Sequence, residues 1–175
     1  MPEYFETFDQ RGHLTGRAPR AVVHREGLWH RSTDVWLFRP DGRLLLQRRA
    51  GQKDLYPGRW DYSVGAHLLP GESYQRGAER GLVEELGLGD LALVALGGLR
   101  RSATEAPELG ILDREFCRSW RALYTGGPLR PDTDEVVEVA WHSPAEVVEW
   151  LRREPEAFTP WFVAAGRETG MLPLR

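Results

Sequence analysis

The chain has 175 residues, of which 41% are hydrophobic and 28% charged, and its formal net charge is -3. This length and balance are typical of one soluble globular domain and exclude wholesale disorder. A slightly acidic protein lacks the basic field that attracts nucleic acid polymers or anionic membranes, so we expect a small ligand instead. The lone cysteine, Cys117, forms no internal disulfide, and neither a signal peptide nor a bilayer-spanning run is recognisable. We therefore expect a cytoplasmic protein with a single domain over residues 1–175.

The N-terminal third has the alternating pattern and the turn residues of β-strands. A strand and a turn are predicted within residues 4–20. Residues 21–38 are interpreted as a hairpin whose turn contains Gly27, which would bring His24 and His30 together from neighbouring strands. A second hairpin turn at Asp41-Gly42 leads into a strand over residues 43–50. A polar loop over residues 51–60 and a further strand over 61–69 follow.

From Ser73 onward the hydrophobic period changes to that of a helix. Apolar residues recur every four positions from Tyr74 to Leu86, Ser73 is suited to cap the first turn, and Gly87 to end the last one. Strand patterns return over residues 91–96, 115–124 and 135–143, and helices are predicted over 144–154 and 161–172. This order predicts an α+β or α/β fold with a mixed β-sheet between layers of helices.

Three carboxylates lie in or next to the predicted helix that ends at Gly87. Glu72 precedes it, and Glu84 and Glu85 lie near its end. A loop followed by a helix can gather such groups around a hard cation, and Mg²⁺ prefers oxygen ligands and substrate phosphates. The alternative is a solvated helix face on which Arg80 and Glu84 form an ordinary ion pair.

Residues 66–88 resemble the Nudix box, GX5EX7REUXEEXGU with U aliphatic. The matching residues are Glu72, Arg80, Leu82, Glu84, Glu85, Gly87 and Leu88. The resemblance implies the Nudix fold and a hydrolase of diphosphates that uses Mg²⁺ or Mn²⁺. Two positions differ, because Ala66 replaces the first glycine and Gly81 replaces a glutamate that ligates metal or orients water in many family hydrolases.

Outside the box the chain resembles type I isopentenyl diphosphate isomerase, through VHREGLWHRS, LLLQRRAGQKDLYPGRWDYSVGAH, GILDREFC and AFTPWF. The resemblance implies a second divalent metal site formed by His24, His30, His67, Asp113 and Glu115. The residues also support this site directly, since Asp113 and Glu115 are two apart on a predicted strand and share one face. A mixed set of nitrogen and oxygen ligands suits zinc, manganese or iron. Singly, each histidine is more typical of a structural residue.

The same resemblance assigns substrate contacts and removes two reactive groups. Arg49 and Lys53, the only lysine, fall where the isomerase binds its diphosphate, and Glu85 falls at a second, magnesium-type ion. Arg48 and Arg80 are further candidates for phosphate contacts, and Trp161 falls where the isomerase has an aromatic residue facing its developing cation. The catalytic cysteine of the isomerase aligns with Gly65, and a helper tyrosine aligns with Ala103.

We therefore interpret the chain as a hydrolase of a small nucleoside or isoprenoid diphosphate. Glu84 and Glu85, with Glu72 as a third carboxylate, would hold the metal, and Glu115 would be the general base. The alternatives are an isomerase or isomerase-like protein that lacks the acid, and a silent diphosphate-binding module. The sequence does not indicate the oligomeric state. It also predicts that Gly81→Glu restores a carboxylate without loss of stability, unless Gly81 packs tightly against a strand.

Overall fold

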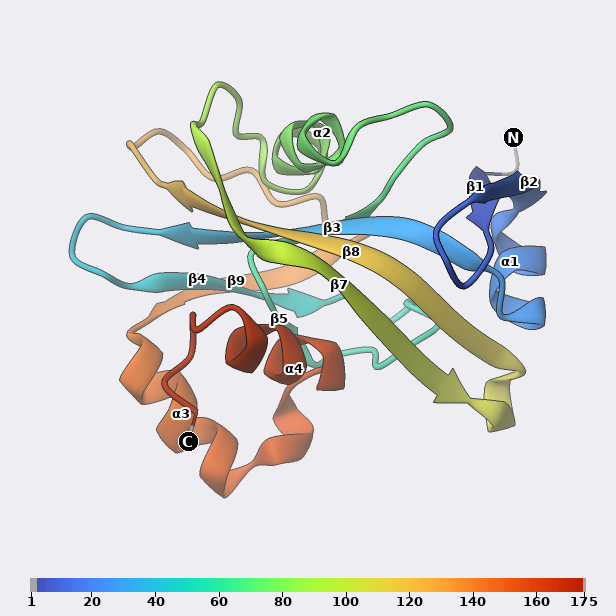
Figure 1. Cartoon of the computed structure of the whole chain (residues 1–175). Coiled ribbons are helices and arrows are strands. Elements are labelled where there is room, and N and C mark those ends of the chain that lie inside the picture. The colour runs from blue at the N-terminus through green and yellow to red at the C-terminus, as the bar shows by residue number, and fades with distance from the viewer. Residues whose placement is uncertain (1–2, 175) are drawn as a thin grey trace.

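A mixed β-sheet forms the middle layer of the protein, in a computed structural model that describes residues 3–174 (Figure 1). The strands are β1 (Tyr4–Phe8), β2 (Leu14–Pro19), β3 (Trp29–Phe38), β4 (Leu44–Arg49), β5 (Trp60–Asp61), β6 (Val64–His67), β7 (Leu93–Ala106), β8 (Ile111–Leu123) and β9 (Val136–His142). The α-helices are α1 (Arg20–Glu26), α2 (Tyr74–Leu86), α3 (Pro144–Arg153) and α4 (Pro160–Glu168). Short 3-10 turns cover Pro107–Leu109 and Pro155–Ala157.

Helices cover both faces of the sheet, because β3 and β4 are apolar on both sides. Successive strand residues point to opposite faces, so Val35 and Leu37 pack under α2 while Trp36 and Phe38 pack under α3 and α4. The prediction of a mixed sheet between helical layers is therefore confirmed. None of the helices in residues 3–174 combines the length and the apolar character needed to cross a membrane.

Strand β3 is the centre of the arrangement. It pairs in parallel with β8, with His30 opposite Glu115, and antiparallel with β6, with Ser32 opposite His67. Its partners on either side thus bring residues from distant parts of the sequence to one end of the same strand.

Helix α2 has the boundaries that its sequence predicts. The Ser73 side chain accepts a hydrogen bond from the Arg76 N–H at 3.3 Å, and Gly87 takes a left-handed conformation with φ of 67°. Ser143 and Glu146 form a reciprocal capping box at the start of α3. These local signals are strong because they satisfy backbone groups that the helix ends leave unpaired.

The predicted hairpin over residues 21–38 is wrong. Its first half is the helix α1, and Gly27 is the left-handed residue that ends this helix, with its N–H donating to the Val23 carbonyl. A glycine at a helix end and one in a hairpin turn both need positive φ, so the residue alone does not distinguish them. His24 and His30 still meet, although a helix and a strand carry them.

Strand β7 is longer than predicted. The strand pattern seen over residues 91–96 resumes after Gly97 and Gly98, and the irregular register between Leu96 and Arg100 accommodates these glycines. Glycine inside a strand pattern therefore marks a bulge here instead of the end of the strand.

Gly81 is packed tightly against β6, and this corrects the expectation for Gly81→Glu. A Cβ atom at Gly81 would lie 2.8 Å from Cγ1 of Val64 and 3.2 Å from Cβ of Ala66. Helix and strand therefore approach each other at a point where only a hydrogen atom fits. A carboxylate at this position requires the helix to move away from the sheet.

We predict that Gly81→Ala lowers the free energy of unfolding by up to about 2 kcal/mol, because overpacking costs about 1–3 kcal/mol and the gain in helix propensity returns roughly 1 kcal/mol. Urea unfolding of the parent and the variant measures this difference. Combining Gly81→Ala with Val64→Ala should cost less than the two single changes added together. A variant more stable than the parent would show that the contact is not constraining.

Candidate functional site

Three histidines form a cluster at one end of β3. His24 comes from α1, His30 from β3 and His67 from the end of β6. Their ring centroids lie 5.2 Å apart for His24 and His30, 5.5 Å for His24 and His67, and 5.1 Å for His30 and His67. Phe5 of β1 stacks on His30 at 5.3 Å and on His67 at 4.7 Å, which closes one side of the cluster.

Two carboxylates from β8 complete the cluster. Asp113 Oδ1 lies 3.5 Å from His30 Nε2 and 3.9 Å from His24 Nε2. Glu115 Oε1 lies 3.3 Å from His67 Nε2 and 3.8 Å from His30 Nε2. The alternation of β8 directs both acids to the same face, as the spacing of two predicts. The five residues proposed from the sequence are thus close together in space.

The polar atoms of this cluster are arranged as ligands for a cation. The buried atoms His24 Nε2, His30 Nε2 and Asp113 Oδ1 have no hydrogen-bond partner among the described residues. His30 Nδ1 lies 3.1 Å from the Leu28 carbonyl, which favours the tautomer whose Nε2 lone pair faces the acids. One donor atom from each of His24, His30, His67 and Asp113 lies within 4.8 Å of the others, so this group could hold a metal ion.

Burial shifts the pKa values of the imidazoles and of the carboxyl groups in opposite directions, and in each case it favours the neutral form. It lowers the pKa of His24 to about 4, with help from the charge of Arg20. Burial also lowers the pKa of His30 and of His67 well below the usual range. The same burial raises the pKa of Asp113 and of Glu115. The imidazoles are therefore neutral and free to coordinate, and the acids lack a positive charge that a divalent ion would supply.

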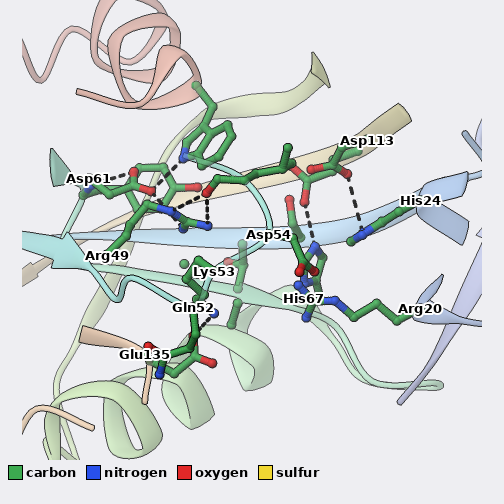
Figure 2. A pocket seen from close by; sticks show the side chains of 18 of the residues that line it. Arg20, His24, Arg49, Gln52, Lys53, Asp54, Asp61, His67, Asp113 and Glu135 are labelled. Carbon is green, nitrogen blue, oxygen red and sulfur yellow. Dashed lines mark hydrogen bonds and ion pairs between the residues drawn. The ribbon is translucent and has the colours of Figure 1, made fainter. Parts of the chain in front are cut away.

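Two of the three histidines, His24 and His67, line a cleft with a volume of about 270 Å³ (Figure 2). His24, His67 and Asp113 lie at one end of this cleft, and Arg49 and Asp61 at the other (Figure 2). A second cavity of about 320 Å³ extends over α2 and shares a rim with the first. The shared rim residues are Arg20, Arg49, Lys53, Gly65, Ala66, His67 and Glu135.

The two predicted diphosphate contacts both lie on this rim and have internal partners. Arg49 donates to the Leu55 carbonyl from Nε at 3.1 Å and from Nη2 at 3.0 Å. Lys53 forms an ion pair with Glu135, which is partly exposed. Arg48, by contrast, is placed outside both cavities, where it bonds to the Gly58 carbonyl and pairs with Glu138. Its predicted phosphate contact therefore does not fit this cleft.

Arg80 of α2 binds two of the Nudix-box carboxylates and the backbone of β6. Arg80 donates to both oxygens of Glu72 at 2.9 Å, to Glu84 at 2.8 Å and to the His67 carbonyl at 2.8 Å. Glu72 is thus used in a clamp that fixes the backbone of His67, and it does not lie free for a cation. The N–H groups of Arg80 donate to Glu72, Glu84 and the His67 carbonyl, so these donors are not directed at a phosphate.

Glu84 and Glu85 line the second cavity. Glu84 is 57% exposed, whereas Glu85 is buried and accepts a weak hydrogen bond from the Gly65 N–H at 3.4 Å. Burial raises the pKa of Glu85 to about 8, and the Gly65 N–H opposes this shift. Two carboxylates are fewer than a dedicated protein site uses, but Mg²⁺ completes its shell with water and substrate phosphates.

Asp61 is a buried carboxylate that sequence reasoning missed. Its Oδ2 accepts a hydrogen bond from Trp161 Nε1 at 2.7 Å and lies 3.4 Å from Arg49 Nη1. Its Oδ1 accepts from the Thr159 hydroxyl at 3.0 Å. The Arg49 guanidinium also lies over the Trp161 ring at 5.1 Å. Asp61 therefore fixes both Arg49 and Trp161, the two predicted substrate contacts at that end of the cleft.

Arg20 and Asp54 are further cleft residues that the sequence did not single out (Figure 2). Arg20 is the first residue of α1. Because a hairpin was predicted where this helix lies, the sequence did not place Arg20 beside the histidines. Asp54 lies in the loop before β5, where no periodic pattern gives a direction to the side chain.

The family comparison assigns residues 28–162 to the NUDIX domain. Isopentenyl-diphosphate Delta-isomerase of Nocardia farcinica is 37% identical over 157 residues, which cover 89% of this chain and 88% of that protein. The enzyme of the same name from Kocuria rhizophila is 33% identical over 172 residues, covering 97% and 94%.

Solved structures share the fold at lower identity. The DR0079 protein of Deinococcus radiodurans aligns with a TM-score of 0.74 and 18% identity, covering 95% of this chain and 99% of the other. A MutT NUDIX hydrolase of Burkholderia pseudomallei aligns with a TM-score of 0.63 and 19% identity, covering 80% and 97%.

We predict that His67→Ala weakens the binding of a divalent metal about 10-fold or more, because it removes one donor from the cluster. Calorimetric titration of the metal-free protein with Mn²⁺ or Zn²⁺ measures the affinity. His13→Ala is the control, since the His13 side chain is 74% exposed and pairs with Asp9, away from the cluster. Equal affinity in the parent and both variants would place the metal elsewhere.

We predict that Asp61→Asn destabilises the protein more at pH 4.5 than at pH 7.5. Burial raises the pKa of Asp61 to about 6, against the lowering effect of Arg49. A raised pKa contributes stability that is fully present below the ordinary pKa of 3.8 and is lost as the pH rises through about 6. Urea unfolding at both pH values gives the difference between parent and variant. A difference that grows with pH would contradict this sign.

Proposed function

The chain belongs to the Nudix family, and on that premise we propose that it hydrolyses a small diphosphate compound with the help of a divalent cation. The observation that carries the proposal is the cleft itself. It combines neutral imidazoles, two acids of raised pKa and a basic rim, while Gly65 offers no proton where an alkene isomerase needs an acid. Hydrolysis needs a base for the attacking water and positive charge near the diphosphate oxygens. It does not need an acid that gives a proton to carbon.

Glu115 is the general base in this proposal. Its carboxylate oxygen accepts the proton of the water that attacks phosphorus, and the raised pKa of Glu115 brings its basicity toward neutral pH, where proton transfer is most effective. The Nε2 atoms of His67 and His30 lie 3.3 and 3.8 Å from Oε1 of that carboxylate. A divalent ion at the histidine cluster, with Mg²⁺ or Mn²⁺ at Glu84 and Glu85, would supply positive charge to the diphosphate oxygens.

Arg49 and Lys53 bind the diphosphate in this proposal. Both occupy the rim that joins the two cavities, so a diphosphate there lies next to Glu85 on one side and the histidines on the other. Lys53 would exchange its partner Glu135 for a phosphate oxygen. Arg49 stays attached to Asp61 and the Leu55 carbonyl, and this attachment presents its guanidinium in a fixed orientation.

An isomerase-like activity is the second candidate, because the cluster of three histidines, Asp113 and Glu115 and the named relatives both favour it. Isomerisation of isopentenyl diphosphate moves a double bond, so one group must give a proton to carbon and another must remove one. Gly65 and Ala103 occupy the two places where the resembling enzymes carry a thiol and a phenol. Of the acid–base groups that the resemblance assigns, Glu115 then remains for both steps.

One paired assay separates the two candidates. We predict that the protein, incubated with Mg²⁺ or Mn²⁺ and a panel of nucleoside, sugar and isoprenoid diphosphates, cleaves at least one of them, as phosphate analysis of the products would show. The same protein should incorporate no deuterium into isopentenyl diphosphate in heavy water, followed by NMR. Rapid deuterium incorporation without cleavage of any diphosphate would favour the isomerase. Binding without either reaction would favour a silent binding module.

Glu115→Gln should lower kcat for that cleavage by about 10²- to 10⁴-fold, the range that general-base catalysis contributes. Glu138→Gln is the matched control, because Glu138 is an exposed residue of β9 that pairs with Arg48 outside the cleft. Thermal unfolding of both variants checks that the fold is retained. A Glu115→Gln enzyme as fast as the parent would assign the base to another group.

A further inference from the structure

The ring of Tyr62 occupies the space that a side chain at Gly65 would fill. A Cβ atom built on Gly65 would lie 2.5 Å from Tyr62 Cε2 and 3.3 Å from the Tyr62 hydroxyl. No real Cβ makes contacts this short, so any other residue at position 65 must push the ring aside. Gly65 and Tyr62 thus form one unit, in which the missing side chain makes room for the phenol.

The phenol of Tyr62 is fixed at its base and open at its hydroxyl. The ring packs against Trp36 of the buried core, with centroids 6.2 Å apart, and the Tyr62 N–H donates to Asp61 at 2.9 Å. The side chain lines the cleft together with Asp61, His67 and Glu115. Within residues 3–174 the Tyr62 hydroxyl makes no hydrogen bond to the protein. It is therefore a donor that faces the cleft without a partner.

The charges around Tyr62 keep this donor protonated. Burial, followed by the negative charges of Asp61 and Asp34, raises the pKa of Tyr62 well above its usual value. A neutral phenol donates one hydrogen bond and accepts another, which suits a hydroxyl, a carbonyl or a ring nitrogen. A prenyl chain offers no such atom and would leave the hydroxyl without a partner in a buried place.

The position of Tyr62 relative to the rim shows which part of a ligand it would meet. Arg49 and Lys53 line both cavities, whereas Tyr62 and Asp61 line only the cleft that also contains His24 and His67. A ligand whose diphosphate lies on the rim and whose organic part enters the cleft beside the histidines meets Tyr62 and Asp61 there. This cleft presents a phenol donor and a carboxylate acceptor at that place.

We propose that Tyr62, placed by Gly65, is the specificity-determining residue of the cleft, and that its hydroxyl binds a polar organic group so that nucleoside or sugar diphosphates are favoured over prenyl diphosphates. This inference rests on the proposed function, in that it names the substrate class of the same cleft. It concerns binding, so it is tested without turnover.

The test measures binding by calorimetry with Mg²⁺ present, in the Glu115→Gln background so that cleavage is suppressed. The probes are pyrophosphate, isopentenyl diphosphate and whichever of ADP, CDP and UDP-glucose binds most tightly. Tyr62→Phe should weaken the polar probe about 10-fold or more, and change pyrophosphate and isopentenyl diphosphate less than twofold. Tyr124→Phe is the control, since its hydroxyl bonds to the Gly127 carbonyl outside both cavities.

Gly65→Ala provides an independent variant, because it displaces the ring without altering Tyr62 itself. It should cause the same selective loss, and it decides the matter if Tyr62→Phe does not fold. Equal weakening of all three probes, or no weakening of the polar probe, would overturn the inference. So would a parent protein that binds isopentenyl diphosphate more tightly than every polar probe. Absence of cleavage alone would overturn only the proposed hydrolysis, because these affinities do not depend on it.

Discussion

The parallel pairing of β3 with β8 is the constraint on which the cleft depends. Its register sets His30 directly opposite Glu115, and the antiparallel register of β6 on β3 sets His67 opposite Ser32. Side chains on a strand alternate between faces, so a shift of one residue in either pairing would move His67 or both acids to the other side of the sheet. The apolar residues of β3, packed on both faces, hold this register in place.

This geometry gathers groups that are costly to bury together. Three imidazoles and two carboxylates share a small volume, and several of their polar atoms have no partner within the described residues. Without a cation, burial favours the uncharged forms, so the histidines are neutral and the pKa values of the acids are raised. A divalent cation relieves both costs at once, since it accepts the imidazole lone pairs and stabilises the ionised carboxylates. The cluster is therefore explained better by metal binding than by a contribution to stability.

Patterns that depend on neighbouring residues could be predicted from the sequence, whereas contacts between distant segments could not. The ends of α2 follow from Ser73 and Gly87, and the shared face of Asp113 and Glu115 follows from a spacing of two. The resemblance to a known family supplied the histidines. Nothing local distinguishes Asp61 from a surface aspartate, because its partners Trp161 and Thr159 come from about 100 residues further along the chain.

The central claim is that the three histidines and Asp113 hold a divalent ion. The most direct measurement is an anomalous-difference map from crystals of the protein grown with Mn²⁺. Our account predicts a peak between His24, His30, His67 and Asp113, within coordination distance of their donor atoms, with Glu115 beside it. A map with manganese only at Glu84 and Glu85, and none among the histidines, would contradict the account.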